Sequence, residues 1–170
     1  MSCDITSGIL KNEKNLIGGI DIVYLFPFVD YSRSQIVLDD QELTSFPATT
    51  IYNVYSSATN YSENTEMEGG DVAWNQNFTI EIPKTEIGSE VYKFSKQNYR
   101  AIYVDRIGNI RILGLFNGLE SQVSSESGQD KASFNGYKVT FTGKEDNQAY
   151  YLTDLEGAGF DTFDNNNYVF

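Results

Sequence analysis

The sequence predicts a mainly β fold, a β-sandwich or half-barrel of strands with one flanking α-helix. Three features support this fold class. Tyr and Phe occur 12 and 11 times against one Trp and two Met, and aromatic residues fit the half-buried surface of a sheet. Short apolar or alternating segments bounded by turn residues recur along the chain. Only one segment has helical spacing. The length of 170 residues fits one domain spanning residues 1–170.

Four strands are expected in the first third of the chain. The apolar run IDIVYLF at 20–26 predicts a short strand, which the following proline ends. Segments 36–38 and 42–46 flank the polar residues DDQ at 39–41, and this pattern predicts a hairpin. A fourth strand is expected at 51–55.

The next segment, SSATNYSENTEMEGGD at about 56–71, is polar, acidic and long, and two alternatives remain open for it. It is either a mobile loop, because it has little apolar surface to bury, or one half of a long hairpin with a strand at 72–82. Strand 72–82 alternates clearly between apolar and polar residues. Its apolar face carries Trp74, Phe78, Ile80 and Ile82.

One helix is expected at about 85–99. Ile87, Val91 and Phe94 recur at spacings of four and three, which places them on one face of a helix. Thr85 is a suitable N-cap residue, and the acidic residues near this end and the basic residues near the other complement the helix dipole. We expect this helix to pack over a sheet.

The second half of the chain returns to strands. They are expected at 101–106, 109–116, 119–126, 134–142 and 150–153. A tight turn at 107–108 and a polar loop at 128–133 separate some of them. The last residues, about 154–170, are rich in Gly and Asn with isolated aromatic residues. We expect an extended C-terminal arm there that acquires its partners from elsewhere.

Charge and composition argue against several classes of function. The formal net charge is −12, and no run of Lys or Arg offsets it, so adhesive binding to nucleic acid or to an anionic membrane is not expected. An acidic surface past which DNA moves without sticking is compatible with this charge, as is simple solubility. No signal peptide or membrane-spanning apolar run is visible. We therefore expect a chain that folds in a reducing cytoplasm.

Residues suited to catalysis are few. The chain has no His and a single cysteine, Cys3, which excludes His-based triads and multi-thiolate zinc sites. Acidic pairs remain, and with 24 acids such pairs are expected by chance. They are Asp39/Asp40, Glu66/Glu68 and Asp161/Asp164. Asp154, Glu156, Asp161 and Asp164 lack the spacing of a calcium loop. We expect no enzyme, no catalytic or metal site and no cofactor.

Two segments carry a family resemblance. Residues 134–152, FNGYKVTFTGKEDNQAYYL, combine a strand containing VTFTGKE with a polar segment and aromatic residues. This pattern resembles the C-terminal core strand of bacteriophage tail-tube proteins. The opening at 3–28, CDITSGILKNEKNLIGGIDIVYLFPF, resembles the start of tail and neck-ring proteins of crAss-like and related Bacteroidetes phages. The order of strands, long loop, helix and further strands also resembles the tail-tube fold.

The resemblance implies a non-enzymatic structural protein of the virion. Tail-tube subunits form a homo-oligomeric ring by pairing sheet edges, and the ring surrounds a channel through which genomic DNA passes. The implied partners are other copies of the chain and adjacent tail or neck proteins. The implied location is the virion tail or neck, after assembly in the host bacterial cytoplasm. Two alternatives remain open, a neck or tail-completion ring and a monomeric carbohydrate-binding β-sandwich module.

The resemblance also suggests which acids would line the channel. Side chains alternate along a strand, so a strand gives every second residue to one face. Glu66 and Glu68 share one face of the possible hairpin, and Glu81 lies on the polar face of its partner strand. We expect these three to face the lumen, and Asp39 and Asp40 to lie at a ring rim. The alternative is that all five are ordinary solvated acids.

Overall fold

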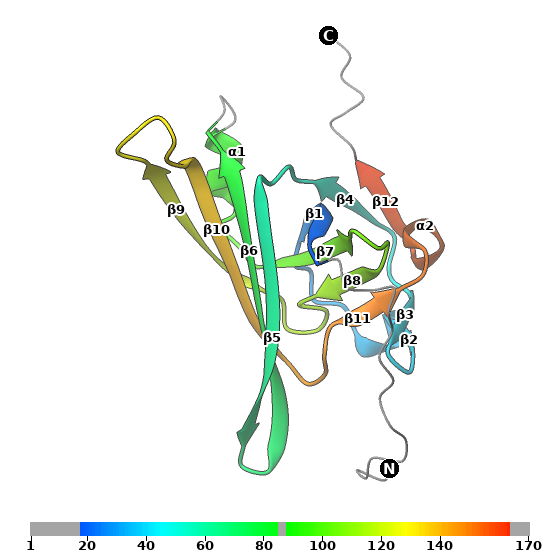
Figure 1. The fold of residues 1–170 in the computed structure, drawn as a ribbon. Coiled ribbons are helices and arrows are strands. Elements are labelled where there is room, and N and C mark those ends of the chain that lie inside the picture. The colour runs from blue at the N-terminus through cyan, green and yellow to red at the C-terminus, as the bar shows by residue number, and fades with distance from the viewer. Residues whose placement is uncertain (1–17, 85–87, 164–170) are drawn as a thin grey trace.

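A computed structural model describes residues 18–84 and 88–163, which form two packed β-sheets with two short α-helices (Figure 1). The larger sheet has the strand order β12-β4-β1-β7-β8-β11-β3-β2. Its strands are β1 (Ile20–Pro27), β2 (Val37–Asp39), β3 (Glu42–Ser45), β4 (Thr49–Asn53), β7 (Tyr99–Asp105), β8 (Ile110–Leu113), β11 (Tyr150–Leu152) and β12 (Phe160–Phe163). A 3-10 turn, η1 (Arg33–Gln35), precedes β2. The mainly β fold predicted from the sequence is confirmed.

The smaller sheet has four antiparallel strands in the order β5-β6-β10-β9. They are β5 (Ala58–Glu68), β6 (Asp71–Pro83), β10 (Asn135–Glu145) and β9 (Glu120–Ser127). One face of this sheet packs on the larger sheet, with Phe78, Ile80 and Phe141 against Val23 and Leu25. This contact is the sandwich core.

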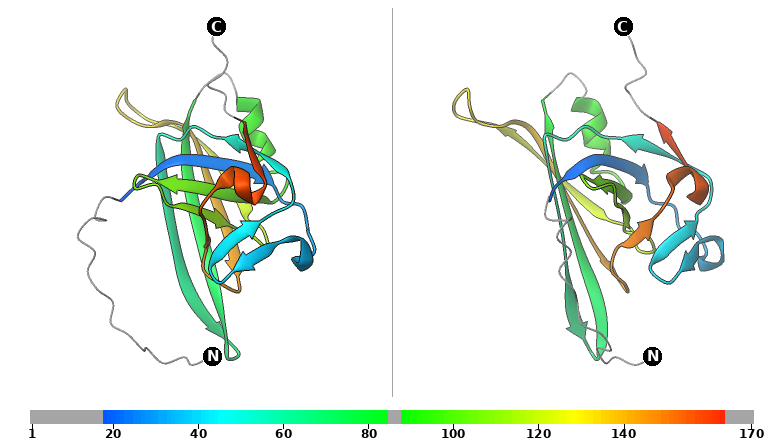
Figure 2. Two further views of the ribbon diagram at one scale, coloured as in Figure 1. Left: turned by 90° about the vertical axis from the view of Figure 1, so that its right-hand side faces the viewer. Right: turned by 45° about the vertical axis from the view of Figure 1, so that its right-hand side comes forward.

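The larger sheet is buried on both faces. Its second face encloses another core, to which β3 contributes Leu43 and β12 contributes Phe160, together with Phe26 and Ile102 from the central strands. Strands far apart in the sheet order therefore share one cluster, because the sheet curves around it (Figure 2). Burial on both faces explains why residues 22–26 of β1 are all apolar or aromatic.

Segment 56–71 adopts the hairpin and not the loop. β5 pairs with β6 along its whole length, from Ala58 opposite Glu81 to Glu68 opposite Asp71. The turn is made by Gly69 and Gly70, both with positive φ, which suits a two-residue hairpin turn. The hairpin extends well beyond the other strands, at the lower end of Figure 1.

The helix is shorter than predicted. α1 spans Gly88–Lys93, and 85–87 lie outside the described residues. After Lys93 the chain continues in tight turns, in which the amides of Phe94 and Lys96 donate to carbonyls three residues earlier. The Ser95 hydroxyl also donates to the Tyr92 carbonyl, 2.8 Å away, which favours a turn over a further helical bond. Val91 and Phe94 do pack on the sandwich core as predicted.

The predicted C-terminal arm is wrong for residues 154–163. The Asp154 carboxylate accepts the amides of Glu156 and Gly157 and so caps a one-turn helix, α2 (Leu155–Ala158). Gly159, with φ of 109°, ends the helix and directs the chain into β12, which pairs in parallel with β4. Phe160 enters the second core, so this segment is held by its own chain. Residues 164–170 lie outside the described part.

Candidate functional site

The candidate site is the outer face of the smaller sheet, the face that points away from the larger sheet. The strand register places polar or small side chains on it and, at the end of β6, Pro83. β5 and β6 contribute Ala58, Asn60, Ser62, Asn64, Glu66, Glu68, Asp71, Ala73, Asn75, Asn77, Thr79 and Glu81. β10 and β9 contribute Gly136, Lys138, Thr140, Thr142, Lys144, Glu120, Gln122, Ser124 and Glu126. Of the described side chains that point outward from these strands, none is aromatic.

The predicted lumen acids share this outer face, with Glu66 and Glu68 near the hairpin tip and Glu81 at the other end of the β5–β6 pair. Glu66 and Glu68 are on β5, and the register places Glu81 of β6 on the same side. Glu66 accepts a hydrogen bond from Asn75 Nδ2 at 3.0 Å, and both β5 acids lie near Lys144. The bonds from Asn75 and then Lys144 lower the pKa of Glu66. The three acids therefore share one surface, on which Glu66 and Glu68 contact Lys144 and Glu81 lies opposite Lys138.

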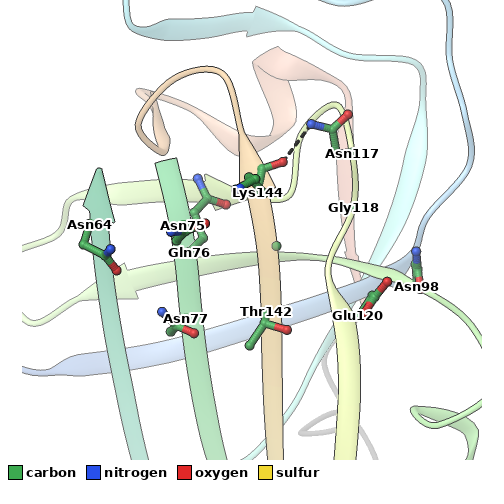
Figure 3. A pocket seen from close by; sticks show the side chains of 11 residues that line it. Asn64, Asn75, Gln76, Asn77, Asn98, Asn117, Gly118, Glu120, Thr142 and Lys144 are labelled. Atoms are coloured by element: carbon green, nitrogen blue, oxygen red, sulfur yellow. Dashed lines mark hydrogen bonds between the residues drawn. The ribbon is translucent and has the colours of Figure 1, made fainter. Parts of the chain in front are cut away.

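A shallow groove of about 580 Å³ opens in this face where β9 begins (Figure 3). Amide side chains dominate its lining, which includes Asn64, Asn75, Gln76, Asn77, Asn98, Asn117, Gly118, Glu120, Thr142, Gly143 and Lys144. Asn117 Nδ2 donates to the Lys144 carbonyl at 2.7 Å and joins the rim of the groove to β10. The groove therefore offers many neutral donors and acceptors, one lysine and one glutamate.

Three buried polar side chains hold the loop that forms this rim, residues 114–118. Gln76 of β6 accepts the Gly114 amide at 2.9 Å. Glu145 of β10 accepts the amide of Asn117 at 2.8 Å and that of the preceding residue. Arg100 of β7 donates from Nε to the carbonyl of the residue after Gly114. Strands of both sheets thus fix one loop.

Burial shifts the pKa of two of these side chains. Arg100 is only 1% exposed and lies over the rings of Phe28, at 4.2 Å, and Phe46, at 5.2 Å. Burial lowers the pKa of Arg100 to about 10, which leaves it charged at neutral pH. Burial also raises the pKa of Glu145, against the opposing effect of its two backbone hydrogen bonds.

The segment TGKE at 142–145 now has a physical explanation. Thr142 and Lys144 point outward into the groove, whereas Gly143 and Glu145 point toward the core. A Cβ on Gly143 would lie 2.7 Å from the carbonyl oxygen of Gly118, so only glycine lets the loop cross β10 so closely. Glu145 then binds the amides of that loop.

Polar contacts of Glu63 connect β5 to the larger sheet and to the residue before β11. Glu63 lies 3.6 Å from Arg111 NH1 and accepts the Ala149 amide at 3.0 Å. Arg111 also lies over the ring of Tyr151 and donates to its hydroxyl. Nearby, burial raises the pKa of Tyr103 to about 12. These contacts anchor the hairpin before it leaves the body of the molecule.

The other acidic pairs are not brought together with the outer face. Asp39 ends β2 and Asp40, with φ of 52°, lies in the β2–β3 turn of the larger sheet. Asp161 lies on β12, and both Asp164 and Cys3 lie outside the described residues. Within residues 18–84 and 88–163, no cluster of three or more metal-ligating side chains is found. No helix in the same ranges is long and apolar enough to cross a membrane.

Comparison of the chain with protein-family models, with curated proteins and with solved structures yields no match.

Proposed function

We propose that this chain is a structural subunit of a homo-oligomeric ring, single or stacked into a tube, in a bacteriophage tail. The outer face of the smaller sheet lines a channel through which DNA passes without specific binding. The subunit performs no catalysis.

The two open edges of the smaller sheet carry this proposal. β5 has 11 residues and β9 has 8, and within the described residues each pairs with a neighbour on one side only. Long open edges promote association between chains. A ring provides that association in a closed form, in which β5 of each copy pairs with β9 of the next.

The strand directions support closure. Four strands that alternate in direction leave the two edges, β5 and β9, running in opposite directions. Rotation about the ring axis preserves the direction of every strand. The joint between copies is therefore antiparallel, like every pair inside the sheet, and the barrel continues with the same hydrogen-bond pattern.

The composition of the outer face supports its assignment to a channel. The face carries six acids and two lysines, a net charge of 2 − 6 = −4 per subunit, among amides and hydroxyls. Repulsion from phosphate and the lack of large apolar or aromatic side chains among the described residues of this face both favour passage of DNA without retention.

The hairpin tip favours stacked rings over a single neck ring. Met67 is 74% exposed and Val72 is 47% exposed. They lie at the tip of the hairpin, on the face that packs against the core nearer the body of the molecule. Exposed apolar side chains at the end of a projecting hairpin suit contact with the next layer of subunits. A carbohydrate-binding module would present an aromatic platform, and the outer face has none among the described side chains.

Disulfide trapping tests the edge pairing. In a Cys3→Ser background, Ser62→Cys on β5 is combined in turn with Gln122→Cys, Ser124→Cys or Glu126→Cys on β9. Within one copy, β5 and β9 are separated by two strands, or roughly 14 Å, too far for a disulfide, which needs Cα atoms within about 7 Å. Oxidation should therefore produce a ladder of covalent oligomers for the pair in register.

Single-cysteine variants are the matched controls, since they can give dimers at most. A ladder in one double variant supports the joint between β5 and β9. Monomers and dimers alone in every double variant would contradict it.

A further inference from the structure

We infer that Glu66 and Glu68 neutralise Lys144 and so prevent the groove from acting as a phosphate-binding site. This inference rests on the proposed function, because it assumes that the outer face meets DNA. It assigns these acids a local role at one lysine, beyond their contribution to the overall charge.

The contacts join three strands. Lys144 of β10 places its Nζ 3.2 Å from Glu66 Oε2 and 3.2 Å from Glu68 Oε2. Asn75 of β6, the strand between β5 and β10, donates to the same Glu66 oxygen at 3.0 Å. The bonds to Glu68 and then Glu66 raise the pKa of Lys144, so the ammonium group stays charged and engaged with both acids.

Without these acids, Lys144 would be a suitable anchor for phosphate. It lies in a groove beside the side chains of Asn64, Asn77 and Thr142, which have hydrogen-bond donors to offer. A lysine with neighbouring amide and hydroxyl donors is a common arrangement for contacting the phosphate backbone. Each phosphate neutralised in this way strengthens binding through counterion release, which would slow DNA in a channel.

The second lysine of the face has a similar arrangement. Lys138 on β10 lies directly opposite Glu81 on β6, so an acid is its cross-strand neighbour. The predicted lumen acids Glu66, Glu68 and Glu81 are thus the ones beside the two lysines. Glu120 and Glu126 lie on the same face, on β9. Neither forms an ion pair with another described residue.

This difference supplies a matched control. Glu66→Gln/Glu68→Gln and Glu120→Gln/Glu126→Gln each remove two negative charges from the same face, and Glu120 also lines the groove. Binding of a fluorescent duplex of about 20 base pairs is measured by anisotropy at low and moderate NaCl. We expect the first variant to bind at least tenfold more tightly than the second.

Adding Lys144→Met to Glu66→Gln/Glu68→Gln should remove the gain and reduce the salt dependence by about one phosphate contact per bound subunit. Lys144→Met alone should weaken DNA binding no more than Lys138→Met, which removes the same charge from the same face, because Lys144 is already neutralised. This single variant keeps the test open if the double variant fails to fold.

Three results would overturn the inference: equal binding by the two double variants, a gain that survives Lys144→Met, or weaker binding by Lys144→Met alone than by Lys138→Met. The assay needs no ring. Failure of assembly would refute the proposed function while leaving the neutralisation of Lys144 measurable, and the reverse outcome would refute only the neutralisation.

Discussion

Gln76, Arg100 and Glu145 show how single residues shape the groove, because they hold its rim from inside the protein. All three are at most 3% exposed. A buried polar group that loses its partner leaves a desolvated donor or acceptor behind, at a cost of about 1–3 kcal/mol. The loop at 114–118 and the groove beside it therefore depend on buried side chains, of which Gln76 also lines the groove.

Glu145 should make stability depend on pH. Its pKa is higher in the folded protein than its ordinary value, because it is buried. Such a carboxyl holds its proton more tightly when folded. Its contribution to stability is therefore full below the unfolded pKa and is lost as pH rises through the folded pKa.

Glu145→Gln lacks this titration. The free energy of unfolding of Glu145→Gln, minus that of the original chain, should increase from about pH 4 upward and then level off. Urea denaturation at a series of pH values measures this difference. A difference that is constant or decreases over this range would contradict the assigned pKa direction.

Sequence reasoning missed these three residues for a physical reason. Gln76 occupies an apolar position of an alternating strand, between Trp74 and Phe78, and this interruption was the only signal available. Such a polar residue either has a hydrogen-bond partner in the core or interrupts the strand. Which of the two holds for Gln76 depends on a loop about 40 residues later in the chain. Spacing within one strand carries no information about that loop.

Among the elements, the β5–β6 hairpin and β12 differ in how far the sequence could predict them. Alternation along 72–82 predicted the strand and its buried face, and Glu66 and Glu68 share a face as expected. The apolar content of 56–71 could not decide between loop and strand, because the partner strand supplies the burial. The C-terminal segment was misjudged because its main contacts, Phe26 and Phe46, are distant in sequence.

Two phenylalanines of β12 test whether this element belongs to the subunit. Phe160 is 1% exposed and stacks on Phe46, with ring centroids 5.0 Å apart. Phe160→Ala should lower the free energy of unfolding by about 3–5 kcal/mol. Phe163 is 42% exposed, so Phe163→Ala should change it by about 1 kcal/mol or less.

Thermal or urea unfolding of the two variants measures this contrast directly. Equal and small effects would mean that residues 160–163 are a free arm, as the sequence alone suggested.

At the scale of the whole molecule, the negative charge favours passage of DNA through the proposed ring but opposes pairing between the subunits. The net charge is −12. Both edges that would pair carry acids and no lysine or arginine: Glu63, Glu66 and Glu68 on β5, and Glu120 and Glu126 on β9. Pairing these edges brings like charges together. Salt should promote assembly, because the screening length falls from about 10 Å at 0.1 M to about 3 Å at 1 M.

Electron microscopy of the purified chain, at increasing concentration in low and high NaCl, tests ring assembly most directly. The proposed edge pairing predicts closed rings of one diameter, alone or stacked into tubes, and more of them at high salt. Monomers at every concentration and salt, or open filaments that never close, would contradict it.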